Sequence, residues 1–112
     1  MKNTAKAITK YIRISPRKAR LAAALIRGRN ANEAQNQLQY SHLKAGRLLG
    51  KTLKSAIANA ETQLDASPDQ LIVEEVRVDE GPTLKRAKPR SKGGRHPIMK
   101  RTSHFTVVLK GE

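Results

Sequence analysis

The first apolar pattern in the chain lies in residues 7–14, "AITKYIRI". Ile8, Ile12 and Ile14 fall on one side of an extended chain, although Lys10 interrupts that side. This alternation predicts a short strand. The next segment, "SPRKARLAAALIRG", has the periodicity of a helix and the signals that mark both of its ends. Ser15 can cap the free N–H groups, proline suits the first helical position, and Gly28 suits a left-handed residue after the last turn.

Two further helices are predicted before the chain returns to strands. The first covers "NEAQNQLQ", with Asn32 as its N-cap, and the second begins near Ser41 and continues to residue 64. Gly46 and Gly50 either weaken the longer helix slightly or permit close packing against a neighbour. At 100° per residue its apolar face comprises Leu49, Leu53, Ala56, Ile57, Ala60 and Leu64.

Strands are predicted near Leu71–Val78 and Phe105–Leu109, and the simplest arrangement pairs them as an antiparallel hairpin. Between them, Gly81–His104 contains eight lysines and arginines and no carboxylate. Pro82, Pro89 and Pro97 would each remove a ladder hydrogen bond, and a Gly-Gly pair allows close approach at the tip. Roughly ten extended residues on each side would project about 30 Å from the body. A loop that is merely kept from aggregating by its charge is the simpler alternative.

The composition predicts one domain, residues 1–112, with a body of residues 1–80 and 102–112 and an arm of about 81–101. The net charge of +14 indicates a polyanionic partner, nucleic acid first and an anionic membrane second. With no cysteine, no signal-peptide core and no long apolar run, a cytoplasmic location is expected. A membrane-surface helix is disfavoured because the chain has no Trp and one Phe. No homo-oligomer is expected.

Basic stripes on two predicted helices strengthen the case for phosphate contact. Arg17, Arg20 and Arg27 fall within an arc of roughly 80° on the first helix, away from the apolar Leu21, Leu25 and Ile26. Neither stripe has interleaved acids, since seven of the nine acids lie between Glu61 and Glu80. A solvated charged face remains the alternative for a single helix. The predicted RNA-binding residues of the body are Arg13, Arg17, Lys18, Arg20, Lys44, Arg47, Lys51 and Lys54. Those of the arm are Lys85, Arg86, Lys88, Arg90, Lys92, Gly93, Gly94, Arg95, Lys100 and Arg101.

Enzyme and cofactor classes find little support in the sequence. His42, His96 and His104 lie on different segments without a carboxylate at metal-ligand spacing, so no metal site is predicted. No serine has a nucleophile-elbow context, and no phosphate-binding loop of the P-loop type is present. No catalytic residue and no cofactor are therefore expected. A DNA-binding helix-turn-helix is disfavoured because the charge is spread over helices and an arm.

Four blocks carry a resemblance to a known family: "YIRISPRKARLAAALIRG", "LKSAIANAE", "VRVDEGPTLKR" and "MKRTSHFTVVL". In this order and spacing they resemble the bacterial large-subunit ribosomal proteins of the L-twenty-two family. The resemblance implies an α+β fold in which three helices pack on a three-stranded antiparallel sheet with a long β-hairpin arm. This chain differs from many members of that family at Gly94, Arg95, His96 and Pro97. The difference affects how the second strand of the arm would pair with the first.

The resemblance also implies a function and partners. The body would lie near the nascent-chain exit site, and the arm, with its tip around Lys88–Gly94, would thread through large-subunit ribosomal RNA and line the exit tunnel near the macrolide site. Partners would be several domains of that RNA, neighbouring large-subunit proteins and the passing nascent polypeptide. The protein would support subunit assembly and translation. Two alternatives remain open: a DNA-binding protein of the nucleoid, and a free RNA-binding translational regulator.

Overall fold

The computed structural model describes residues 4–41, 43–89 and 95–111, and for residues 84–89 and 95–99 it describes the backbone alone. The helices are α1 (Pro16–Ile26), α2 (Ala31–Gln39) and α3 (Lys44–Gln63), followed by the short 3₁₀ turn η1 (Pro68–Gln70). The strands are β1 (Thr4–Ile12), β2 (Leu71–Glu80), β3 (Leu84–Pro89), β4 (Arg95–Lys100) and β5 (Ser103–Gly111). Within these ranges, the helices and strands match the predicted α+β class.

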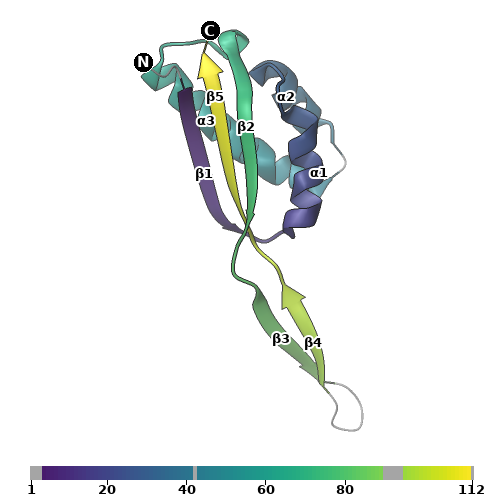
Figure 1. Cartoon of the computed structure of the whole chain (residues 1–112). Helices are drawn as coiled ribbons and strands as arrows, with labels where there is room; N and C mark the ends of the chain where they lie inside the picture. The colour runs from purple at the N-terminus through teal and green to yellow at the C-terminus, as the bar shows by residue number, and fades with distance from the viewer. Residues whose placement is uncertain (1–3, 42, 90–94, 112) are drawn as a thin grey trace.

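The body is a two-layer structure, with helices packed on a twisted sheet (Figure 1). The three strands of this sheet have the order β1-β5-β2, and both pairings are antiparallel. The β3–β4 pair forms a separate two-stranded sheet that projects from one end of the body, which confirms the predicted hairpin arm in its backbone. The radius of gyration is 16.9 Å, well above the roughly 13 Å expected of a compact domain of this size. The fold is therefore elongated.

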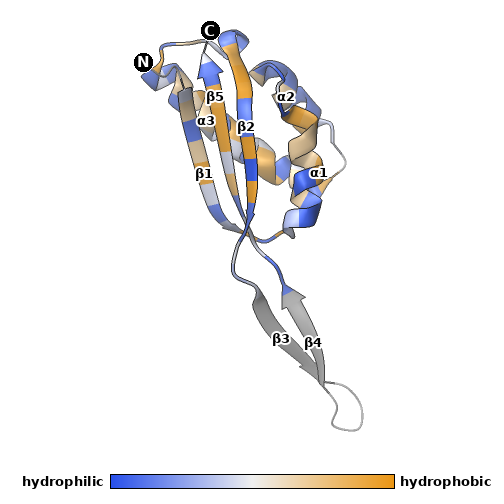
Figure 2. Ribbon diagram, in the orientation of Figure 1, coloured by the Kyte–Doolittle hydropathy of each residue, from blue (hydrophilic) through white to orange (hydrophobic). Residues whose placement is uncertain are grey.

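The core lies between the sheet and the helices and is almost wholly aliphatic. Phe105 on β5 is fully buried, whereas Tyr11 and Tyr40 are mostly exposed, so one aromatic ring serves the core. Orange apolar positions make up much of β2 and β5 in Figure 2, interrupted by blue hydrophilic positions. The predicted face of α3 is confirmed from Leu49 to Ala60, and Leu64 is half-buried at its end.

The predicted ends of α1 are confirmed, whereas the predicted N-cap of α2 is wrong. Ser15 accepts a hydrogen bond from the N–H of Lys18, Pro16 begins α1, and Gly28 has a φ of 76°, all as predicted. The N-cap of α2 is Asn30 and not Asn32: the Asn32 N–H donates to Asn30 Oδ1. Two asparagines two positions apart offer the same cap chemistry, and the tertiary bridge from Asn30 to Ile72 selects the first.

The buried face of α1 also differs from the expected one. It consists of Pro16, Ala19, Ala22, Ala23 and Ile26. Leu21 and Leu25, which were expected on the apolar side with Ile26, are 61% and 37% exposed. Alanines at this spacing let α1 approach β2 closely, and larger leucines at the same positions would hold the helix away. The leucines are left outside the core.

Two β-bulges explain why the apolar alternation of the strands is broken. In β2, Val73 pairs with Leu109 and Glu75 pairs with Val108, so Glu74 is the extra residue that brings Val76 back to the core side. In β1 the register shifts between Thr9 and Ile12. The core side of β1 is Ala5 and Ala7, whereas Ile8, expected inward, is 50% exposed. A bulge moves side chains to the opposite face, which periodicity alone cannot reveal.

No helix in the part of the chain that the structure describes is long and apolar enough to cross a membrane.

Gly46 and Gly50 provide a matched pair for testing how α2 and α3 pack. A Cβ added at Gly46 would lie 2.9 Å from Ser41 Cβ and 3.1 Å from Leu38 O, whereas one at Gly50 would meet only Leu38 Cβ, at 3.8 Å. We expect Gly46→Ala to destabilise the fold by about 1–2 kcal/mol, because overpacking outweighs the gain in helix propensity. Gly50→Ala should stabilise it by roughly 0.5–1 kcal/mol. Urea unfolding followed by circular dichroism measures both, and equal stability of the two variants would contradict this packing.

Candidate nucleic-acid interface

All eight predicted RNA-binding residues of the body have exposed side chains. Among the side chains that the structure describes, the one ion pair joins Arg77 Nε to Glu75 Oε1 at 3.2 Å, on the outer face of β2. The basic residues of the helices are therefore not neutralised by carboxylates within the described part of the fold. Their charge remains available to a partner, and mutual repulsion makes an anionic partner favourable.

The structure brings five of the predicted residues together in one concave surface, which we call the junction cleft. It lies where the segment before α1, the start of α3 and the base of the arm meet, and its volume is about 740 Å³. The predicted residues that line it are Arg13, Lys18, Lys44, Lys100 and Arg101. The Nζ of Lys44 lies 3.5 Å from the carbonyl of Arg13, so the first turn of α3 contacts the segment before α1 across this cleft. Residues distant in sequence thus form one cationic surface.

Three other predicted residues share a second concavity, the α2–α3 groove. Arg47, Lys51 and Lys54 follow one another along α3 and line this groove of about 620 Å³ opposite Gln35 and Gln39 of α2. Its floor includes Gly46 and Gly50, so the close helix packing described above also shapes the groove. A row of cations facing amide side chains suits a phosphate backbone, since both can donate hydrogen bonds to phosphate oxygens.

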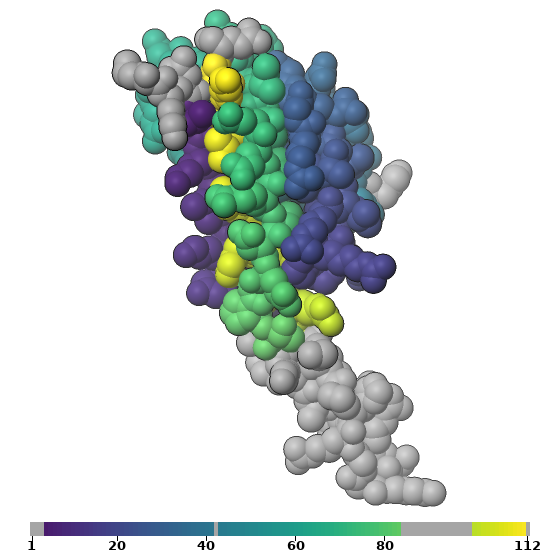
Figure 3. Space-filling view, viewed as in Figure 1, coloured from purple at the N-terminus to yellow at the C-terminus, as the bar shows by residue number. Residues whose placement is uncertain are grey.

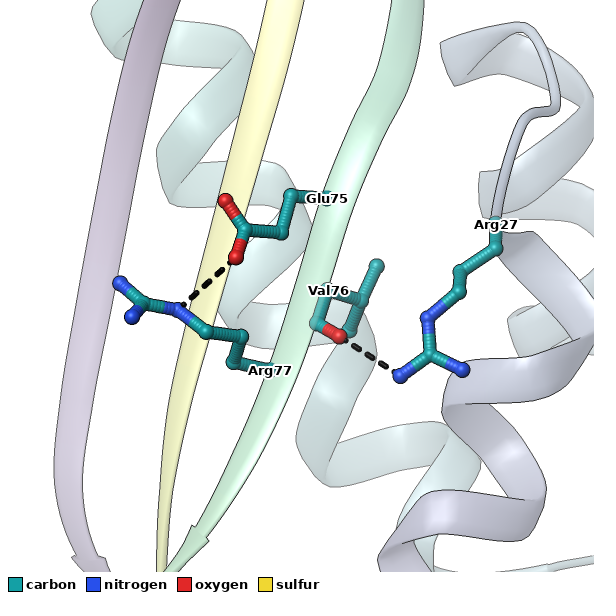
Figure 4. Close-up of polar contacts among 4 residues, drawn as sticks. All are labelled: Arg27, Glu75, Val76 and Arg77. Atoms are coloured by element: carbon teal, nitrogen blue, oxygen red, sulfur yellow. Dashed lines mark hydrogen bonds and ion pairs between the residues drawn. The ribbon is translucent and has the colours of Figure 1, made fainter.

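Arg20 and Arg27 have a structural partner that the sequence did not indicate. Arg20 donates to the carbonyl of Val78 at 3.1 Å. Figure 4 shows the second bond, in which Arg27 donates to the carbonyl of Val76 at 2.8 Å. These carbonyls lie on the side of β2 that α1 covers. Further along the same edge, the Val73 N–H donates to Arg29 O at 2.8 Å. The free edge of β2 is thus protected by α1 and its C-terminal loop, which blocks pairing with another chain.

The predicted arm residues are described only through the backbone. Lys85, Arg86 and Lys88 lie on β3 and Arg95 lies on β4, with Lys88 paired to His96 and Ala87 paired to Pro97. The returning strand therefore pairs despite the departure noted at these positions. Lys100 ends β4, and Arg101 lies between β4 and β5. The remaining predicted residues, Arg90, Lys92, Gly93 and Gly94, lie outside the described residues.

Acidic side chains are kept away from these cationic surfaces. Glu75 and Asp79 are exposed and alternate with the inward Val76 and Val78 on β2, so they lie on the sheet face that the helices do not cover. Figure 3 views the body from the side of the sheet. These two acids therefore lie on the opposite side of the sheet from the basic helices.

Sequence reasoning missed the apolar part of the junction cleft. Ile14, Leu21 and Leu43 also line it, together with Ser15. A signal was available, because Leu21 lies off the arc formed by the alanines of α1, but the helical periodicity placed it only on the side away from the arginines. Among the described residues, no group of three His, Asp or Glu side chains could hold a metal ion.

Comparison with known proteins finds relatives over nearly the whole chain. A model of the family described as ribosomal protein L22p/L17e matches residues 7–110. The chain is 72% identical over 105 residues to the large ribosomal subunit protein uL22 of Protochlamydia amoebophila, covering 94% of this chain and 95% of that protein. It is 59% identical over 104 residues to the protein of the same name from Chlamydia trachomatis serovar L2, covering 93% and 94% of the two chains.

Arg17 and Arg20 offer a test that separates structural from partner-binding cations. Arg17→Ala removes an exposed charge in the first turn of α1, whereas Arg20→Ala also removes the hydrogen bond to Val78 O. We expect Arg20→Ala to lower the free energy of unfolding by about 1 kcal/mol more than Arg17→Ala does. Parallel chemical denaturation of the two variants measures the difference. If Arg17→Ala lowered the free energy of unfolding as much as Arg20→Ala does, the hydrogen bond from Arg20 to Val78 O would make no contribution to stability.

Proposed function

The chain belongs to the ribosomal protein L22p/L17e family, and on that premise we propose that it is a structural component of the large ribosomal subunit that binds ribosomal RNA with its body and its arm. The observation that carries this proposal is the cationic surface: among the residues that the structure describes, the linings of the junction cleft and the α2–α3 groove contain no carboxylate. RNA neutralises such a surface, and release of its counterions drives binding.

The whole chain acts as one ribosomal-protein domain with two parts. The body, residues 1–80 and 102–112, holds RNA through Arg13, Arg17, Lys18, Arg20 and the basic side of α3. The arm, about residues 81–101, extends into the RNA and lines the nascent-chain exit tunnel, while the body lies near its exit. The elongated fold supports this division, because its longest dimension is 63 Å and the others are 27 and 17 Å. In this role the protein supports subunit assembly and contacts neighbouring ribosomal proteins and the nascent chain.

We expect the isolated protein to bind deproteinised large-subunit ribosomal RNA with a steep dependence on salt. Neutralising six or more phosphates should weaken binding at least about 1,000-fold between roughly 50 and 200 mM monovalent salt. Filter binding at several salt concentrations gives the slope, with duplex DNA as the comparison. A nearly flat salt response would refute the phosphate contacts, and equal affinity for duplex DNA would favour the nucleoid alternative.

The arm is tested in cells by removing its charge. We expect Lys88→Ala, Arg90→Ala and Lys92→Ala together to leave the body folded and to reduce recovery of the protein with large subunits in sucrose gradients after a moderate-salt wash. The reason is that RNA must neutralise the arm during assembly. The matched control replaces Lys6, Lys10 and Lys110, three exposed lysines of the sheet, and removes the same charge.

Two outcomes of this experiment would contradict the proposal. Recovery of the unaltered protein at the top of the gradient would show that it is no built-in component of the subunit. Equal loss from the arm variant and the control variant would show that only net charge matters. Circular dichroism of both purified variants verifies that the body remains folded.

A further inference from the structure

The junction cleft differs from an ordinary basic surface because apolar side chains lie among its cations. Leu21 is 61% exposed and Leu43 is 41% exposed, and both line the cleft beside the buried Ile14. Single exposed leucines are common on protein surfaces, but here one from α1 and one from the N-cap of α3 line the same concavity. A ligand that covered them would remove apolar area from water. The cleft therefore favours a ligand that is partly anionic and partly apolar.

The positive potential in the cleft is concentrated where two helices begin. Ser15 and Lys18 lie at the start of α1, and Leu43 and Lys44 lie at the start of α3. The first turns of both helices lack acidic residues, and the N-cap Leu43 has no side chain that could accept a hydrogen bond. A helix N-terminus carries partial positive charge and favours acidic neighbours. Lysines at both positions add repulsion, which an anion held between them would relieve.

The volume of the cleft distinguishes between possible anions. About 740 Å³ falls within the range of sites that hold small organic ligands, and it is much larger than a phosphate ion requires. Arg13 and Arg101 lie in the same lining, and the plane of a guanidinium can stack on a nucleobase. A phosphate with a ribose and a base attached would satisfy the cationic and the apolar parts together. Bases in an RNA helix are stacked and paired, so only an unpaired nucleotide can present both.

We propose that the junction cleft holds one unpaired nucleotide of the bound RNA. Its phosphate lies between Lys18 and Lys44 at the two helix starts, and its base and ribose cover Leu21 and Leu43. This inference rests on the proposed RNA-binding function and makes it specific: the body recognises a bulged or looped nucleotide at this point in addition to neutralising the backbone.

The direct test is an NMR titration of the full-length protein with adenosine 5′-monophosphate, inorganic phosphate and adenosine at constant ionic strength. We expect the nucleotide to shift the amide resonances of Ser15, Lys18, Leu43 and Lys44 saturably. It should bind at least about fivefold tighter than inorganic phosphate, because the leucines contribute only to the nucleotide. The absence of saturable shifts at these amides, or equal affinity for both anions, would overturn the proposal.

Two variants separate the charged part of the cleft from the apolar part. Lys18→Gln with Lys44→Gln should weaken binding of both anions at least about tenfold and raise the melting temperature of the anion-free protein, since repulsion at the helix starts is removed. Leu21→Ser, on the exposed side of α1 and away from both helix starts, should weaken nucleotide binding and lower the preference for the nucleotide over phosphate. Controls are Lys6→Gln with Lys110→Gln, and Leu25→Ser, whose exposed leucine lies outside the cleft lining. A Leu21→Ser variant that retains the full preference would overturn the proposal.

The outcomes also separate this inference from the function on which it rests. A protein that sediments with large subunits, but whose cleft amides do not respond to the nucleotide, retains the proposed function and lacks this site. If the protein neither sediments with large subunits nor responds to the nucleotide at the cleft amides, both the proposed function and this site are refuted. The titration of the unaltered chain decides the matter even if a variant fails to fold.

Discussion

The fold depends on the insertion of β5 between β1 and β2. These two strands do not pair with each other, so the sheet exists only when the last strand of the chain supplies ladders to both. Ser103, the first residue of β5, also donates from its Oγ to Ile14 O at 2.7 Å, joining the sheet to the segment that leads into α1. Because β1 and β5 lie at opposite ends of the sequence, the entropy of closing a long loop must be overcome first. Burial of Phe105 and of the aliphatic core provides the free energy that offsets this entropy.

The positions of the charged residues around this sheet lower the stability of the isolated protein. Glu75 and Asp79 of β2 lie on the open face of the sheet, while the lysines and arginines gather at helix starts and along α3, where carboxylates would have stabilised the fold. Arg20 and Arg27 show that the same residue type can also serve the structure, by covering the edge of β2. A domain selected for stability alone would have acidic residues at the starts of α1 and α3. Residues that lower the stability of the free protein and suit an anionic partner are typical of functional surfaces.

Much of this architecture could be predicted from the sequence, because local signals and tertiary contacts agree there. The cap at Ser15, the left-handed Gly28 and the apolar face of α3 each follow from chemistry within a few residues. The wrong predictions concern features that are determined by contacts between residues distant in sequence. The N-cap was misplaced because Asn30 bridges to Ile72, and the inward side of β1 was misjudged because a bulge near Tyr11 changes the register.

The candidate site shows the same limit. Composition and spacing identified its cations, but they could not show that five of them meet in one cleft or that two leucines share it. They also did not show that Arg20 bonds a strand edge. Concavity depends on how helices and loops far apart in sequence pack, and no local pattern records it.

The junction between body and arm shows which part of the arm the body itself holds. The Gly81 N–H donates to Thr102 O at 3.0 Å, and Thr102 Oγ1 donates to Pro82 O at 2.6 Å, so the body determines where the arm begins and in which direction it leaves. Beyond that point two strands pair only with each other, and an isolated two-stranded hairpin is marginally stable in water. Its many like charges oppose pairing further. A surface from outside the chain would stabilise the arm, and under the proposed function ribosomal RNA would provide both the contact and the opposite charge.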